Sequence, residues 1–141
     1  MTAREYLGQA YRLENKIQIL RRRIEELQEM RGSVSSPGFE EHYNASRNTD
    51  APFVKTIEKI VEYEKKYEEK MRLLLDLKEQ IRECIDKLDN PDEALVLEHR
   101  YIYNSSWVDI GSELYVDDRT VRRWHNKALS HFKVPDNPIT I

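Results

Sequence analysis

The residues best suited to chemistry in this sequence are basic side chains gathered toward its C-terminal end. Five basic residues and one acid lie between Asp118 and Lys133, a local charge of +4, whereas the whole chain carries −3. Lys and Arg neutralise DNA phosphates, and Arg can also bind a guanine edge with two hydrogen bonds. The residues that we expect to contact DNA are Ser106, Asp118, Arg119, Thr120, Arg122, Arg123, Asn126 and Lys127.

Two helices separated by a short turn would position these side chains. We predict one helix over about 107–114, capped by a box-like Ser106 and Asp109, and a second over about 118–132, capped by Asp117. Gly111 lacks a side chain where another helix could pass closely. A short first helix over about 91–103 would complete the group, because Asn90 and Pro91 form a strong helix start. The inward positions should be Leu95, Leu97, Tyr101, Ile102, Trp107, Ile110, Leu114, Val121, Trp124, Ala128 and Leu129.

The N-terminal third has the repeat of a coiled-coil helix. Its apolar residues are spaced alternately four and three apart from Tyr6 to Leu27, and Thr2 with Glu5 makes a capping box. We expect this helix to run from Thr2 to about Arg31, with Gly32 just beyond its end. A second heptad helix should begin near Asp50, with Pro52 in its first turn, and run to about residue 88.

The two long helices suggest a hairpin that associates with further copies. An antiparallel pair leaves one face of the second helix exposed to water. Two hairpins packed as a four-helix bundle would bury that face, so we expect a homodimer or higher oligomer. The predicted organisation is a hairpin over 1–90, with a flexible connection at about 32–51, a helix-turn-helix domain over 91–133 and an extended tail over 134–141. The oligomerisation residues would be Leu13, Ile17, Leu20, Ile24, Leu27, Ile60, Tyr67, Met71, Leu74 and Ile81.

Other classes of protein find little support in the sequence. The single Cys84 excludes an internal disulfide, and His125 and His131 lie six residues apart, so they do not share a helical face as metal ligands would. Phosphate loops, nucleophile elbows and zinc motifs are missing, so we expect neither an enzyme nor a metal or cofactor. The chain contains no apolar run of membrane-spanning length and no signal-peptide pattern, so we expect a cytoplasmic protein.

The C-terminal pattern Trp107-x-x-Ile110-Gly111-x-x-Leu114-Tyr115-Val116-Asp117-x-x-Thr120-Val121, followed by Ala128-Leu129, resembles region 4 of sigma-70-class sigma factors. Arg100-Tyr101 resembles the pair that often ends the preceding helix there. Tyr115 stands where that turn usually has Gly, and Asp117 where it usually has Ser or Thr. The acid Asp118 could accept a hydrogen bond from cytosine N4 or repel phosphate.

The whole chain resembles the phage-encoded ArpU/RinA-like transcriptional regulators of Gram-positive bacteria. The predicted helices together make an all-α protein. The resemblance implies that this protein lies in the bacterial cytoplasm, binds double-stranded DNA and activates late phage genes, with RNA polymerase as an expected partner. Two alternatives remain open from the sequence. One is a DNA-packaging protein like a small terminase subunit, which would form rings. The other is an interaction module that binds RNA polymerase without touching DNA.

Overall fold

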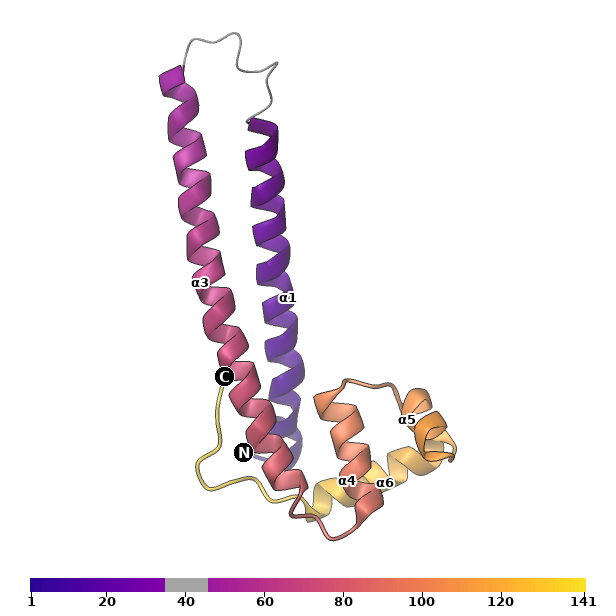
Figure 1. Cartoon of the computed structure of the whole chain (residues 1–141). Coiled ribbons are helices and arrows are strands. Elements are labelled where there is room, and N and C mark those ends of the chain that lie inside the picture. The colour runs from indigo at the N-terminus through magenta and orange to yellow at the C-terminus, as the bar shows by residue number, and fades with distance from the viewer. Residues whose placement is uncertain (35–45) are drawn as a thin grey trace. The chain divides into compact units, whose positions relative to one another are not determined.

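The computed structural model describes residues 1–34 and 46–141, with side chains described for 1–31 and 54–141. Its regular elements are the long helices α1 (Ala3–Val34) and α3 (Ser46–Ile85), the short helix α4 (Pro91–Leu97), a π-helical turn η1 (Glu98–Ile102), and the helices α5 (Trp107–Leu114) and α6 (Asp118–His131) (Figure 1). The described residues contain no strand, so the prediction of an all-α fold is confirmed. None of the described helices is both long enough and apolar enough to cross a membrane.

The chain divides into two compact units. Unit 1 comprises residues 1–14 and 73–141, and unit 2 comprises residues 15–72. Unit 1 therefore holds α4, α5 and α6 together with the first part of α1 and the last part of α3. The predicted domain boundary at residue 91 stays a prediction.

Unit 1 begins with the predicted capping box. The Thr2 N–H donates to Glu5 Oε2 at 2.9 Å, and the Glu5 N–H donates to Thr2 Oγ1 at 3.2 Å. Further along, the Lys78 ammonium lies 3.1 Å from a Glu14 carboxylate oxygen, which joins α3 to α1 within this unit. The most deeply buried large side chains of these two helix segments are Tyr6, Leu7, Leu13, Leu77, Ile81 and Ile85.

Unit 2 consists of the remaining parts of α1 and α3. The Arg23 guanidinium lies 5.6 Å from the centre of the Tyr63 ring, a cation–π contact between the two helices. The apolar residues that we placed on heptad seams are buried here at Ile17, Leu20 and Ile60, and half-buried at Ile24, Leu27, Tyr67 and Met71.

Two boundaries of the predicted long helices were wrong. Helix α1 continues through Gly32 to Val34, because a glycine costs a helix about 1 kcal/mol relative to alanine without stopping it. Helix α3 begins at Ser46, so Pro52 lies inside it and not in its first turn. The small polar residues that suggested a loop at 46–50 are also residues that favour helix starts. The remainder of the predicted flexible connection, 35–45, lies outside the described residues.

The first C-terminal helix also differs from its prediction. Regular α-helix ends at Leu97, and the next five residues form the wider turn η1. Leu95 is exposed, whereas Glu93, Val96 and Leu97 are buried. The face of α4 is set by its packing on α6, which turns Val96 and not Leu95 into the core.

Candidate nucleic-acid interface

The C-terminal helices share a small core that fixes their arrangement. Helix α6 packs against both α4 and α5. Val96, Ile110 and Val121 are fully buried, one from each of these helices. Half-buried side chains close around them: Trp107, Leu114, Val116 and Trp124. This core holds α6 by one face and leaves the opposite face outside.

The turn between α5 and α6 depends on two residues. Tyr115 has the left-handed conformation, with φ 59° and ψ 40°, and its side chain is 94% exposed. Its backbone N–H and that of Val116 both donate to the Gly111 carbonyl. A Cβ at Gly111 would lie 2.6 Å from the Val116 carbonyl oxygen. The closest neighbour that requires glycine at this position is therefore the turn itself, and the first residue of α6, Asp118, follows with its N atom at 3.5 Å.

Helix α6 starts at the predicted cap. The Thr120 N–H donates to Asp117 Oδ1 at 2.9 Å. Hydrogen bonding from Thr120 lowers the pKa of the Asp117 carboxyl below its usual value, and Arg119 and Arg123 lower it further. Ser106 caps α5 in the same way, because its hydroxyl accepts from the Asp109 N–H at 3.1 Å.

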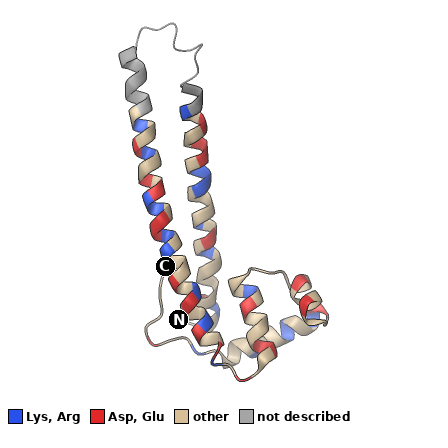
Figure 2. Cartoon of the chain, in the orientation of Figure 1, with Lys and Arg blue, Asp and Glu red and all other residues tan. Residues whose placement is uncertain are grey.

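The predicted DNA-contacting residues of α6 lie mainly on one exposed stripe. We call Arg119, Arg122, Arg123, Asn126 and Lys127 the basic face of α6; all five are exposed, and Figure 2 colours the Arg and Lys positions blue. The buried residues Val121, His125 and Ala128 lie on the opposite side of the same helix. Of the other predicted residues, Ser106 is exposed, and Asp118 and Thr120 are half-buried.

One acid lies beside the basic face. Asp118 Oδ2 is 3.3 Å from Arg122 Nη2, one turn further along α6. Both side chains are about half exposed, at 43% and 59%, so the pair contributes little to stability. Its consequence is positional, because the carboxylate holds the Arg122 guanidinium toward the start of the helix.

A buried polar group behind the basic face was missed by the sequence analysis. The His125 side chain is 3% exposed, and its Nε2 forms a 2.6 Å hydrogen bond with the Tyr101 hydroxyl of η1. The Trp107 ring meets the imidazole edge-on at 4.8 Å. The spacing of His125 from Val121 and Ala128, four and three residues, is the signal that could have placed it inward.

The neighbouring Arg100 also supports this core. Its guanidinium lies 4.0 Å from the centre of the Trp107 ring, and its Nη1 donates to the Ser105 carbonyl at 3.0 Å. Arg100 and Tyr101 thus connect η1 to α5 and α6, respectively.

Comparison with known proteins identifies the family. Residues 5–133 match the model of a family described as protein of unknown function (DUF722), and the chain belongs to that family. No curated protein and no solved structure matches the chain.

Proposed function

We propose that this protein is a sequence-specific double-stranded DNA-binding regulator that acts as an oligomer. The observation that carries the proposal is the basic face of α6, a stripe of four cations and one amide on a helix whose other side is fixed in a core. A helix held in this way can enter the major groove without unfolding its support.

The side chains of the basic face suit the two tasks of a DNA-contacting helix. Arg119, Arg122 and Arg123 lie in the first two turns, the part of a recognition helix that contacts base edges. Asn126 can bind adenine with two hydrogen bonds, and Lys127 suits a phosphate. The short left-handed turn before α6 supports a helix-turn-helix unit.

The regulatory role rests on the resemblance to ArpU/RinA-like regulators and to sigma region 4. It makes late phage genes the target and RNA polymerase the partner.

Binding to a random-sequence DNA duplex across a salt series, followed by fluorescence anisotropy, tests the proposal. We expect affinity to fall steeply with salt, because cations released from phosphates drive binding. In the Arg122→Ala/Arg123→Ala variant the slope of log K against log salt should become shallower by about 1–2. On a selected site, each Arg that binds a guanine should contribute about 1–3 kcal/mol.

The matched control removes two adjacent exposed arginines elsewhere, in Arg21→Ala/Arg22→Ala, with the same change in net charge. This variant should bind like the wild type. Lys127→Ala should weaken binding equally on all sequences and lower the salt slope by about 1. Absence of binding at low salt, or equal losses in the two double variants, would refute the proposal and favour a protein partner for the basic face.

A further inference from the structure

The last residues of the chain have an irregular conformation, and hydrogen bonds of their main chain attach them to the α1 and α3 segments of unit 1. The Ile139 N–H donates to Gln80 Oε1 at 2.9 Å, and Gln80 Nε2 donates to the Asn137 carbonyl at 3.0 Å. Gln9 Nε2 donates to the Ile139 carbonyl at 2.9 Å, and the Ile141 N–H donates to Gln9 Oε1 at 3.1 Å. Two side-chain amides, one from α1 and one from α3, thus bind four main-chain groups at alternate residues of the tail.

A single tyrosine orients both amides. The Tyr6 hydroxyl donates to Gln80 Oε1 at 2.7 Å, and Gln9 Nε2 also donates to the Tyr6 carbonyl at 3.2 Å. Burial raises the pKa of the Tyr6 hydroxyl, so it keeps the proton that it donates. The Tyr6 ring stacks on Phe132, directly after α6, at 6.0 Å. The amides are therefore held in place by groups outside the tail.

We propose that Tyr6, Gln9 and Gln80 form a peptide-binding site that recognises the main chain of an extended segment, and that its ligand is the chain's own residues 137–141. Alternate residues of an extended peptide present N–H and C=O groups on one edge, which sheet edges use to bind added strands. Here two glutamines take the place of that edge. The proposal does not depend on DNA binding.

The burial of Gln9 supports a dedicated site. Gln9 is only 4% exposed, and burying an amide without hydrogen-bond partners would destabilise the folded state. Gln9 forms two side-chain hydrogen bonds with the tail and one with the Tyr6 carbonyl. A buried glutamine whose partners are mainly tail main chain indicates a position shaped for that ligand.

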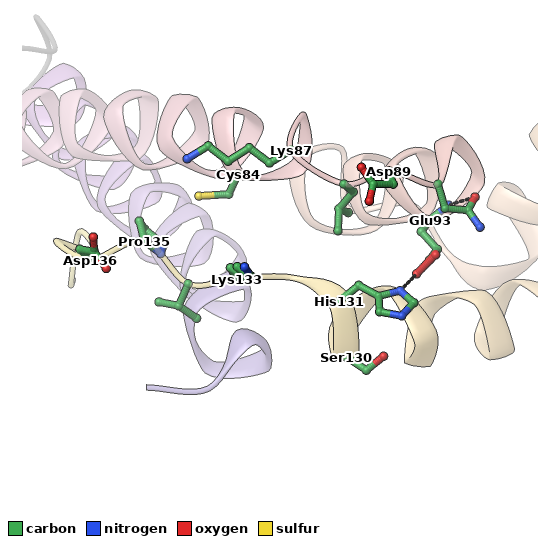
Figure 3. Close-up of a pocket in the computed structure, with 12 residues that line it drawn as sticks. Cys84, Lys87, Asp89, Glu93, Ser130, His131, Lys133, Pro135 and Asp136 are labelled. Atoms are coloured by element: carbon green, nitrogen blue, oxygen red, sulfur yellow. Dashed lines mark hydrogen bonds and ion pairs between the residues drawn. The ribbon is translucent and has the colours of Figure 1, made fainter.

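The segment leading to the tail is not closely packed on one side. A cavity of about 910 Å³ lies between the end of α3, the end of α6 and residues 133–136. Figure 3 shows Lys133, Pro135 and Asp136 along one side of it, opposite Cys84 and Lys87. The hydrogen bonds that Gln9 and Gln80 form with the tail all go to residues 137–141, so we expect a separate peptide with the same main-chain groups to compete for them.

Hydrogen exchange in the full chain gives the first test. The amides of Ile139 and Ile141 should be protected in the wild type and lose protection in Gln9→Leu and Gln80→Leu. Gln18→Leu, on an exposed position of α1, is the matched control and should leave both amides unchanged. Unprotected amides in the wild type, or equal protection in all three variants, would overturn the proposal.

A fluorescent peptide of residues 134–141 gives the second test. The full-length Ile139→Pro variant cannot donate from residue 139, so its site should be open to the peptide in solution. The wild-type chain, whose own tail fills the site, should bind this peptide at least about tenfold more weakly. Circular dichroism checks that the Ile139→Pro variant is folded. If the variant is not folded, the hydrogen-exchange experiment alone tests the proposal.

Changes to the peptide distinguish recognition of its main chain from recognition of its side chains. Methylation of the amide nitrogen of Ile139 should abolish binding, because it removes one donor and crowds the edge. Alanine at Asn137 and Thr140 should change affinity less than about threefold, because the site contacts main chain there. Equal binding of the N-methylated peptide would show that side chains alone attach the tail, and would refute main-chain recognition.

Discussion

At the scale of single residues, His125 is a buried imidazole that folding keeps neutral. Burial is the largest cause that lowers its pKa, and together with the charges of Arg4 and Arg100 it brings the pKa to about 4. In the unfolded chain its pKa is about 6.5. Between these values the unfolded chain binds a proton that the folded chain does not, so the folded state loses stability as the pH falls.

We therefore predict that the free energy of unfolding decreases from pH 6.5 toward pH 4 by up to about 3 kcal/mol on account of His125 alone. Above pH 6.5 this contribution is constant. Urea unfolding followed by circular dichroism at several pH values measures it. His125→Gln should remove this part of the pH dependence, whereas His99→Gln, on the half-buried side of η1, should retain it. Parallel pH curves for wild type and His125→Gln would show that His125 titrates normally.

The carboxylate of Asp118 sets a second prediction, which rests on the proposed function. An acid beside the basic face repels phosphates and also holds the Arg122 guanidinium. Asp118→Asn should raise affinity for random duplex DNA about three- to tenfold and make its salt slope steeper. Fluorescence anisotropy measures both quantities.

Asp92→Asn is the control for Asp118→Asn, because Asp92 is an exposed acid in the first turn of α4. It should leave binding unchanged. If the wild type binds DNA and Asp118→Asn binds no more tightly, Asp118 does not limit nonspecific binding. That outcome would leave the proposed role of the basic face unchanged.

At the scale of elements, the turn between α5 and α6 depends on the absence of a side chain. Gly111→Ala would place a methyl group 2.6 Å from the Val116 carbonyl oxygen, so the backbone must move. We expect a loss of about 1–3 kcal/mol in the free energy of unfolding. Ser112→Ala, on the exposed neighbour in the same helix, should cost less than about 0.5 kcal/mol. A Gly111→Ala protein as stable as Ser112→Ala would mean that the turn adapts.

Tyr115 shows what the sequence could not predict about this turn. The helices on either side of it could be predicted, because Ser106 and Asp117 are strong helix caps and the spacing of apolar residues indicates the buried faces. A tyrosine gives no local signal for a left-handed conformation, which glycine and asparagine favour. That conformation follows from the two N–H groups that must reach Gly111, a tertiary requirement of joining α5 to α6.

The same distinction applies to the candidate site. Exposure of Arg119, Arg122 and Arg123 follows from helical periodicity alone, since they lie opposite Val121. The burial of His125 depends on Tyr101, which lies 24 residues earlier and is presented by η1. Nothing in the sequence indicated a π-helical turn there, and a side chain's hydrogen-bonding partner across such a distance requires the fold.

At the scale of the whole molecule, the predicted oligomerisation residues are largely used within one chain. Leu13, Ile17, Leu20, Ile60, Leu74 and Ile81 are buried without a second copy. Among the described side chains of unit 2, four large apolar ones are nevertheless exposed, between 46% and 59%: Ile19, Met30, Val54 and Val61. Exposed apolar residues on a two-helix unit are candidates for burial against a further pair of helices.

We predict that association uses Val54 and Val61, which lie seven residues apart and so share one face of α3. The wild type should sediment as a dimer or larger species in analytical ultracentrifugation. The dissociation constant of Val54→Gln/Val61→Gln should be at least about tenfold higher, because each buried valine contributes about 1.5 kcal/mol or more. Glutamine favours helix, so the variant should remain folded. Lys55→Gln/Lys66→Gln alters two exposed positions of the same helix that are turned away from the face of Val54 and Val61, and this variant should associate like the wild type. A dimer favours the regulator, whereas a ring of eight or more copies favours the packaging alternative. A wild type that remains a single chain at every concentration would contradict association through α3 and would leave each basic face to bind DNA alone.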